Sequence, residues 1–333
     1  MTRGLTREEI EIFHKEGCLV VEDLFSESDL LPVIDEISDE ILVRARRLVE
    51  EGKLRSTYEQ LGFERQLAAI DKEADTLLPK ISSGALSGPE IFRLIIHPKL
   101  LDIAESLCGP ELIASSVYRL RPKLPHDPRG EVPWHQDSGY FDPACDKGLI
   151  LTVWLPLVDA SADNGCLYVL PRLHKSEVFS HRPNKEGTYL EIKTKDFPRK
   201  HKAVAVPVRK GSVLLMTNRT PHASFENKGN TVRWSMDLRY QSANLPNNAA
   251  FSPREPGFAE SGRESVPPAC YPPSADFLAR SQNRPSDVLS DAKIFNRKRA
   301  EYRENFERKA ASSMRSNQQR KVAINSFSLE RWS

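Results

Sequence analysis

The spacing of apolar residues divides the chain into a helical front and a β-rich middle. Between residues 30 and 48 the apolar positions recur at helical spacing, which predicts an amphipathic helix with one packed face. Thr6 and Glu9 form a capping box that begins an earlier helix ending at Gly17, and Pro98 begins another that runs through residue 107. From residue 112 onward, short β-like runs broken by Pro and Gly predict strands at 112–121, 132–137, 149–157, 166–170, 203–208, 212–217 and 231–240. This pattern predicts a mainly β sandwich or barrel with packed helices.

Less regular segments lie between and after these elements. Residues 51–90 are polar, and we predict a loop that either borders a pocket or simply connects two elements. Residues 172–202 are charged and are predicted to form a long surface loop, of the kind that often acts as a lid. After residue 241 the chain is Pro-rich, and residues 286–312 are predicted to be a charged helix. We therefore expect one domain over residues 1–250 and an extension over 251–333 that packs on it or beside it.

Composition narrows the class of protein. The 333 residues carry a formal charge of +2, which does not favour nucleic acid or an acidic membrane surface as a partner. Basic residues near the C-terminus alternate with glutamates, which is more typical of a solvated helix than of a nucleic-acid patch. No apolar run is long enough to cross a membrane, no secretory signal is apparent, and the five cysteines form no C-x-x-C pair. We expect a cytoplasmic protein with a small-molecule substrate; the sequence does not decide between a monomer and a homodimer.

The stretch from residue 132 to 139 holds the first two candidate metal ligands. Successive side chains of an extended backbone point to opposite faces, so His135 and Asp137 are predicted to face the same way and Gln136 the other way. Among the remaining seven histidines, His222 follows the predicted strand 212–217 closely and is the best third ligand. Two histidines and one carboxylate on one side of a metal form the facial triad of non-haem Fe(II) oxygenases, in which the opposite positions stay open.

Arg233 lies eleven residues after His222, on a predicted strand. An arginine that enters a metal cavity from a strand can hold a carboxylate through two parallel hydrogen bonds. Ser224 is close enough in sequence to His222 to add a hydroxyl donor. Each feature alone has a plainer interpretation, because an H-x-D pair is often polar surface and a single arginine is often salt-bridged, but their combination favours a metal site.

On these residues the sequence resembles the phytanoyl-CoA dioxygenase-like family of Fe(II)/2-oxoglutarate-dependent oxygenases. The matching stretches are Trp134–Asp137, Gly139–Phe141, Val153–Leu157, Asp163–Pro171 with His174 and Lys175, Lys210–Gly211, Pro221–Ser224 and Arg233. The resemblance covers roughly residues 5–240. It implies a double-stranded β-helix, the cupin-like jelly roll, with helices packed on one sheet.

The resemblance also implies roles for single residues. His135, Asp137 and His222 are expected to bind the iron, and Arg233, helped by Ser224, is expected to anchor the distal carboxylate of 2-oxoglutarate. Trp154 matches a family tryptophan that lines the co-substrate pocket, although a core aromatic residue on a strand fits the pattern too. Arg121 stands where several family members place a lysine near the co-substrate. Gln136 belongs to the shared H-Q-D text, but strand alternation points it away from the iron.

The implied activity uses Fe(II) with 2-oxoglutarate and O2 as co-substrates. The keto acid is converted to succinate and CO2 while a small organic, lipid-like or natural-product-like substrate is oxidised, with hydroxylation as the usual outcome. Desaturation or ring closure would use the same residues. The alternatives are a cupin-like metal-binding protein without turnover and a zinc hydrolase, which would have no need of Arg233.

Basic residues near the predicted mouth of the pocket give an indication of the charge of the substrate. They indicate an anionic or polar substrate, and surface exposure would explain them equally well; they are Arg119, Arg121, Lys123, Arg172 and Arg219. His97 and His174 are predicted to be structural rather than ligating.

Overall fold

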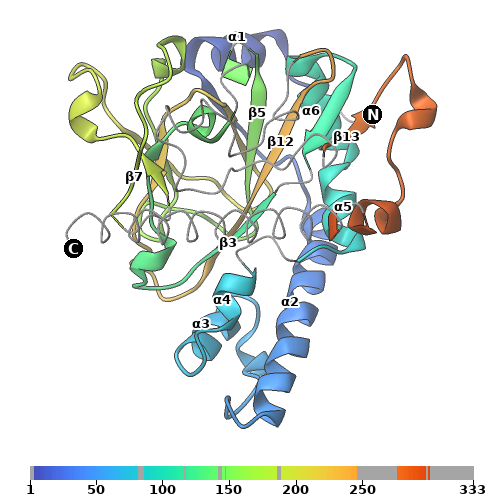
Figure 1. Ribbon diagram of the computed structural model, residues 1–333, viewed down its shortest axis with the longest axis vertical. Coiled ribbons are helices and arrows are strands. Elements are labelled where there is room, and N and C mark those ends of the chain that lie inside the picture. Colours follow the sequence, from blue (N-terminus) through green and yellow to red (C-terminus); the bar gives the residue numbers. More distant parts are fainter. Residues whose placement is uncertain are drawn as a thin grey trace, which may run out of the picture.

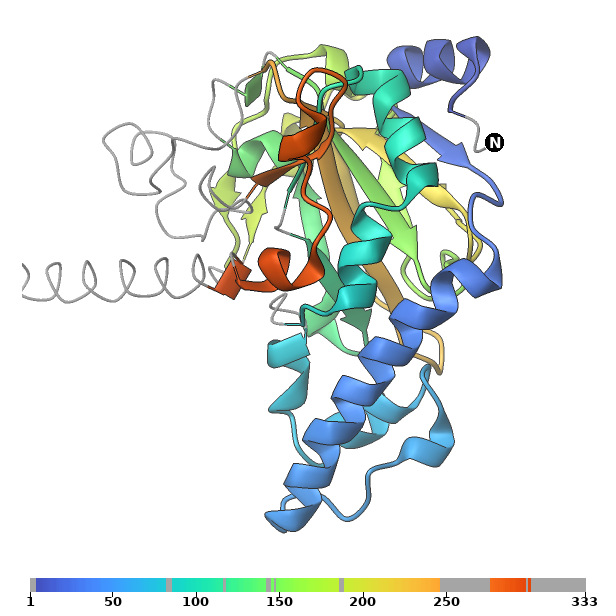
Figure 2. The ribbon, with the colours of Figure 1, turned by 90° about the vertical axis from the view of Figure 1, so that its right-hand side faces the viewer.

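The computed structural model describes residues 4–81, 86–115, 118–141, 145–146, 148–185, 189–245, 276–297 and 299–300. Its β-strands form one body that helices cover on one side, and α2, α3 and α4 extend away from this body (Figure 1). The view in Figure 2 shows α2, α5 and α6 lying along one face of the sheet. The bounds of these helices are α1 (Arg7–Glu16), α2 (Glu27–Glu50), α3 (Gln66–Asp71), α4 (Leu77–Lys80), α5 (Pro89–Ile95) and α6 (Pro98–Cys108).

Two antiparallel sheets make up the β body. The larger sheet has the order β1-β10-β5-β12-β2-β13, and β3 also pairs with β12. Its strands are β1 (Cys18–Val21), β2 (Leu112–Ser115), β3 (Arg119–Lys123), β5 (Ile150–Pro156), β10 (Val213–Thr217), β12 (Arg233–Ser242) and β13 (Asp276–Arg280). The smaller sheet has the order β4-β11-β6-β9. Its strands are β4 (Val132–His135), β6 (Leu167–Val169), β9 (Val204–Val206) and β11 (His222–Ser224).

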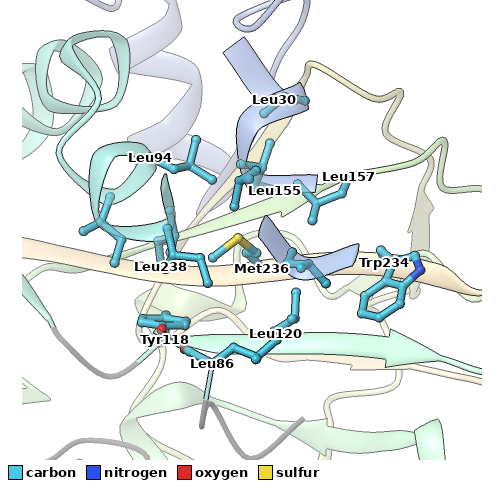
Figure 3. Packing of buried hydrophobic residues seen from close by; sticks show 14 of the residues in the cluster. Leu30, Leu86, Leu94, Tyr118, Leu120, Leu155, Leu157, Trp234, Met236 and Leu238 are labelled. Atoms are coloured by element: carbon cyan, nitrogen blue, oxygen red, sulfur yellow. Dashed lines mark hydrogen bonds between the residues drawn. The ribbon is translucent and has the colours of Figure 1, made fainter. Parts of the chain in front are cut away.

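Strand alternation gives the larger sheet two chemically different faces. On β12 the side chains of Trp234, Met236 and Leu238 belong to the main hydrophobic core, which the helices complete. Figure 3 shows these residues packed with Leu30 of α2 and Leu94 of α5. The intervening residues of β12 face the smaller sheet, and they are polar or charged: Arg233, Ser235, Asp237 and Arg239. The period of two therefore directs a row of polar side chains into the space between the sheets.

This arrangement is the double-stranded β-helix that the sequence predicts. The helix predicted to start at Thr6 is α1, whose capping box is present and whose C-cap Gly17 has φ 81°. Two predicted loops contain more structure than expected. Residues 51–90 include α3 and α4, and residues 172–202 include the short paired strands β7 (Arg182–Pro183) and β8 (Leu190–Glu191). These helices and strands are too short to produce a clear periodic signal in the sequence.

The described part of the C-terminal segment packs on the larger sheet. Strand β13 pairs with β2, and Phe277 and Phe295 contact Phe92 of α5. The predicted helix 286–312 is helical at residues 292–297, while the Pro-rich stretch and the end of this helix lie outside the described residues. The division into residues 1–250 and 251–333 stays a prediction.

No helix in the described part of the chain is long and apolar enough to span a membrane. Among the described residues no disulfide joins the four cysteines, which are Cys18, Cys108, Cys145 and Cys166. The cytoplasmic location stays a prediction.

Candidate metal centre

Three predicted ligands meet between the two sheets. One ligand atom each of His135, Asp137 and His222 lies within 4.8 Å of the others, and all three residues are buried. His135 ends β4 and His222 begins β11, and the two are direct cross-strand partners. The predicted strand 132–137 is too long, because Asp137 opens a 3₁₀ turn after β4. Gln136 nevertheless keeps an extended backbone, so His135 and Asp137 still face the same side.

The hydrogen bonds of the two imidazoles leave the same nitrogen available on each ring. Nδ1 of His135 lies 2.8 Å from the carbonyl oxygen of Pro133, and Nδ1 of His222 lies 3.0 Å from that of Thr220. A carbonyl only accepts, so each Nδ1 carries the proton and each Nε2 keeps its lone pair. Ligating histidines are oriented in this way by a backbone acceptor. The donor set therefore fits a divalent transition metal.

Asp137 is held by the larger sheet at both carboxylate oxygens. The Thr152 hydroxyl donates to Oδ2 at 2.6 Å, and Nη2 of Arg239 donates to Oδ1 at 3.2 Å. Burial by itself raises the pKa of a carboxyl group, but Arg239, with His222 and His135, holds the pKa of Asp137 well below its usual range. Burial, together with His222, lowers the pKa of His135 well below its ordinary value. At neutral pH the site therefore offers one carboxylate and an unprotonated His135 imidazole.

Arg233 lies in the same pocket and is buried without a carboxylate partner among the described residues. Its Nη1 donates to Ser235 Oγ at 2.6 Å, and its Nη2 donates to the carbonyl of Gly165 at 3.1 Å and to Ser224 Oγ at 3.3 Å. Its Nε is buried and has no acceptor in the part of the chain that the structure describes. The guanidinium lies 5.4 Å from the ring centroid of Trp154, so the two predicted co-substrate residues are in contact. A carboxylate entering the pocket would complete the hydrogen bonding of this group.

A cavity of about 100 Å³ joins the ligands and Arg233. Arg121 and Lys123 of β3, Tyr189, and Leu78 of α4 also line it. The segment 51–90 therefore does border a pocket, through the wall that Leu78 supplies.

The family model described as "Phytanoyl-CoA dioxygenase (PhyH)" matches residues 13–235. The chain belongs to this family. Human peroxisomal phytanoyl-CoA dioxygenase is 25% identical over 243 residues, which cover 72% of this chain and 69% of that protein. Mouse phytanoyl-CoA dioxygenase domain-containing protein 1 is 25% identical over 270 residues, which cover 72% of this chain and 91% of that protein.

A solved structure has a fold similar to that of this chain. The non-haem monooxygenase ThoJ, in its apo form, has a TM-score of 0.52 and 21% identity, and the match covers 72% of this chain and 79% of that one. The expected double-stranded β-helix is thereby confirmed. At this identity the likeness concerns the fold alone.

Arg121, which is predicted to lie near the co-substrate, forms an ion pair in the pocket wall. Its Nε lies 2.5 Å from Asp237 Oδ2, the oxygen that accepts this hydrogen bond. Although burial opposes a charge there, Asp237 raises the pKa of Arg121 above its ordinary value. Arg121 and Asp237 therefore form an ion pair that neutralises both charges in the pocket wall. The contact of Arg121 with a co-substrate stays a prediction.

Several other predictions have clear structural outcomes. Gln136 points away from the ligands, since its amide donates to the Arg219 carbonyl and its Oε1 accepts from the Phe179 amide. Arg172 was expected near the mouth and instead pairs with Glu16 on the surface. Arg219, also expected there, donates to the carbonyl of Ser176 and does not line the cavity. Both arginines belong to loops, whose direction the sequence pattern does not determine.

His97 and His174 are structural, as predicted. His97 caps α6 by accepting from the Lys99 amide, and His174 Nε2 lies 3.1 Å from the carbonyl of His14.

The sequence reasoning missed the residues that support the ligands. Thr152 and Arg239 hold Asp137, and Gly165 supplies the carbonyl that both Arg233 and Ser224 use as an acceptor. Gly165 has φ 80°, a conformation that favours glycine. The signal for Gly165 was its place in the Asn-Gly-Cys stretch, whereas nothing local marks Thr152.

Proposed function

We propose that the protein is a non-haem Fe(II)/2-oxoglutarate-dependent dioxygenase that hydroxylates a small organic, lipid-like or natural-product-like substrate. The observation that carries this proposal is the joint presence of a buried His-Asp-His group and a buried arginine without a carboxylate partner in one cavity. The triad suits ferrous iron, and Arg233 suits the far carboxylate of a dicarboxylic keto acid. A zinc hydrolase would have no use for Arg233 in this place.

Each residue has a defined task in this proposal. His135, Asp137 and His222 would hold the iron from one side and leave the opposite side open for the keto acid and O2. When bound, ferrous iron supplies the redox chemistry by which O2 and 2-oxoglutarate yield succinate, CO2 and one oxygen atom for the substrate. Arg233 and Ser224 would fix the other end of the keto acid, and Trp154 would form one wall beside it. The burial of the three ligands and of Arg233 would limit the access of water to the reacting groups.

The test is turnover of 2-oxoglutarate by the purified protein loaded with Fe(II). We expect succinate, measured by mass spectrometry, to appear with O2 and to increase when a panel of candidate substrates contains the right one. Asp137→Ala removes a ligand and is expected to abolish this succinate. Unchanged succinate in that variant would remove the assignment, and no succinate from the wild-type protein with any substrate would favour a metal-binding protein without turnover. The structure of the oxidised product separates hydroxylation from desaturation and ring closure.

A further inference from the structure

Two buried basic side chains lie side by side in the pocket. Lys123 of β3 and Arg233 of β12 are direct cross-strand partners, and each is 2% exposed. Among the described residues neither forms an ion pair with a carboxylate. The ammonium group of Lys123 donates to the carbonyl of Phe225, which is a neutral acceptor. Burying two like charges together is costly unless an anion joins them.

The path of the Lys123 side chain is fixed by two glycines. A Cβ on Gly130 would lie 3.1 Å from Cγ of Lys123, and a Cβ on Gly165 would lie 2.7 Å from its Cδ. A side chain at position 165 would therefore displace the aliphatic stem, and one at position 130 would crowd it. Surface lysines usually carry their ammonium group out to water, whereas the side chain of Lys123 is buried. Gly165 also supplies the carbonyl that Arg233 uses, so the same residue adjoins both basic side chains.

We propose that Lys123 is a second cationic contact for the carboxylate that Arg233 holds, and that Lys123 takes up a proton from solvent as this carboxylate enters. The inference rests on the proposed use of 2-oxoglutarate and adds a residue to its binding. The far carboxylate of the keto acid has two oxygens and can accept from an ammonium and a guanidinium together. No covalent bond changes, and the proton comes from the buffer.

The charged groups around Lys123 explain why its protonation depends on the anion. Arg233 and Arg121 disfavour a charge on Lys123, while Glu131 and Cys166 favour one. Arg121 is already paired with Asp237, so the unpaired Arg233 is the main opposing group. Burial first, and then Arg233, lower the pKa of Lys123 to about 6. The empty pocket therefore holds mostly neutral lysine at pH 7.5, and an anion beside it restores the charge.

The test is anaerobic calorimetry of 2-oxoglutarate binding to the Fe(II)-loaded protein in two buffers that differ in heat of ionisation. For the wild-type protein at pH 7.5 we expect the binding enthalpy to differ between the two buffers. The difference should correspond to the uptake of nearly one proton per bound 2-oxoglutarate. Lys123→Met should weaken binding roughly ten- to hundredfold, the range expected for a hydrogen bond to a charged group, and should abolish the buffer dependence. Lys123→Gln keeps a donor without a charge and should abolish the proton uptake as well. Lys202→Met, at an exposed lysine outside the pocket, is the matched control and should resemble the wild type.

A second ligand separates the Lys123 contact from general damage to the site. The keto acid 2-oxobutanoate lacks the far carboxylate, so Lys123→Met should bind it as well as the wild type does. Equal affinity of the wild type and Lys123→Met for 2-oxoglutarate would overturn the contact, and the same heat in both buffers would overturn the proton uptake. A wild-type protein that binds no keto acid would overturn the proposed function together with this inference. Wild-type binding with an unaffected variant would overturn this inference alone.

Discussion

Thr152 and Arg239 are cross-strand partners on β5 and β12, and each donates a hydrogen bond to a different oxygen of Asp137. The carboxylate is thus fixed by the larger sheet, whereas the two histidines belong to the smaller sheet. The geometry of the metal centre consequently depends on how the two sheets pack on each other. Mutation of groups that orient the ligands in this way commonly lowers metal affinity or activity ten- to hundredfold.

Removing the Thr152 hydroxyl should weaken metal binding. Thr152→Val keeps the shape of the side chain, leaves Asp137 Oδ2 without its donor, and is expected to lower Fe(II) affinity roughly ten- to hundredfold. The measurement is anaerobic competition with a chelator of known affinity. Thr152→Ser retains the hydroxyl and should stay near the wild-type value. Equal metal affinity in Thr152→Val and the wild type would show that this hydrogen bond does not position Asp137.

Some of the site follows from the sequence because it depends on local geometry. The period of two places His135 with Asp137, and it places Arg233 on the inner face of β12, without any knowledge of the rest of the chain. His222 could be predicted as the partner of His135 because it closely follows a predicted strand and because the chain has few histidines. The N-terminal helices could be predicted for the same reason, since amphipathic spacing is a local property.

The supporting residues could not be predicted because they depend on register between distant segments. The register of β5 with β12 sets Thr152 beside Arg239, and the packing of the two sheets brings both to Asp137; no local pattern encodes either. In the sequence, Lys123 is one of several basic residues near the predicted mouth of the pocket. The register of β3 with β12 sets Lys123 opposite Arg233, where its side chain is buried. Arg172 looked the same in the sequence and lies on the surface. The positions of basic residues along the sequence therefore do not show which of them line the pocket.

Gln136 should matter for the segment 172–202 rather than for the metal. Its side chain bridges the Arg219 carbonyl and the Phe179 amide, and Gln136→Ala would remove the partner of both half-buried groups. The expected loss is about 1–3 kcal/mol in the free energy of unfolding, with faster protease cleavage within residues 176–202. Gln136→Glu keeps the acceptor for Phe179 and should be cleaved less readily than the alanine variant. A variant that lost metal affinity with unchanged proteolysis would instead place Gln136 in the metal centre.

Arg233 should govern the requirement for 2-oxoglutarate. Arg233→Ala removes the group proposed to face the far carboxylate, and the KM for 2-oxoglutarate is expected to rise roughly tenfold or more, as for the loss of a hydrogen bond to a charged group. Arg233→Lys keeps the charge but loses the planar fork, so it should lie between the alanine variant and the wild type. Both KM values come from succinate release at varied keto acid. An unaltered KM in Arg233→Ala would remove the anchoring role.

Lys123 should make the stability of the protein without co-substrate depend on pH. Its pKa is about 6 in the folded protein, against an ordinary value of 10.5. Between these values the unfolded chain binds a proton that the folded chain does not, so this residue makes the free energy of unfolding rise with pH. Lys123→Met removes the effect and the cost of a buried charge, so it should be more stable than the wild type, most strongly near pH 6 and less so towards pH 10. Urea unfolding of both proteins across this range is the measurement, with Lys202→Met as the control. A constant difference between wild type and Lys123→Met across the range would show that Lys123 keeps its ordinary pKa in the folded protein.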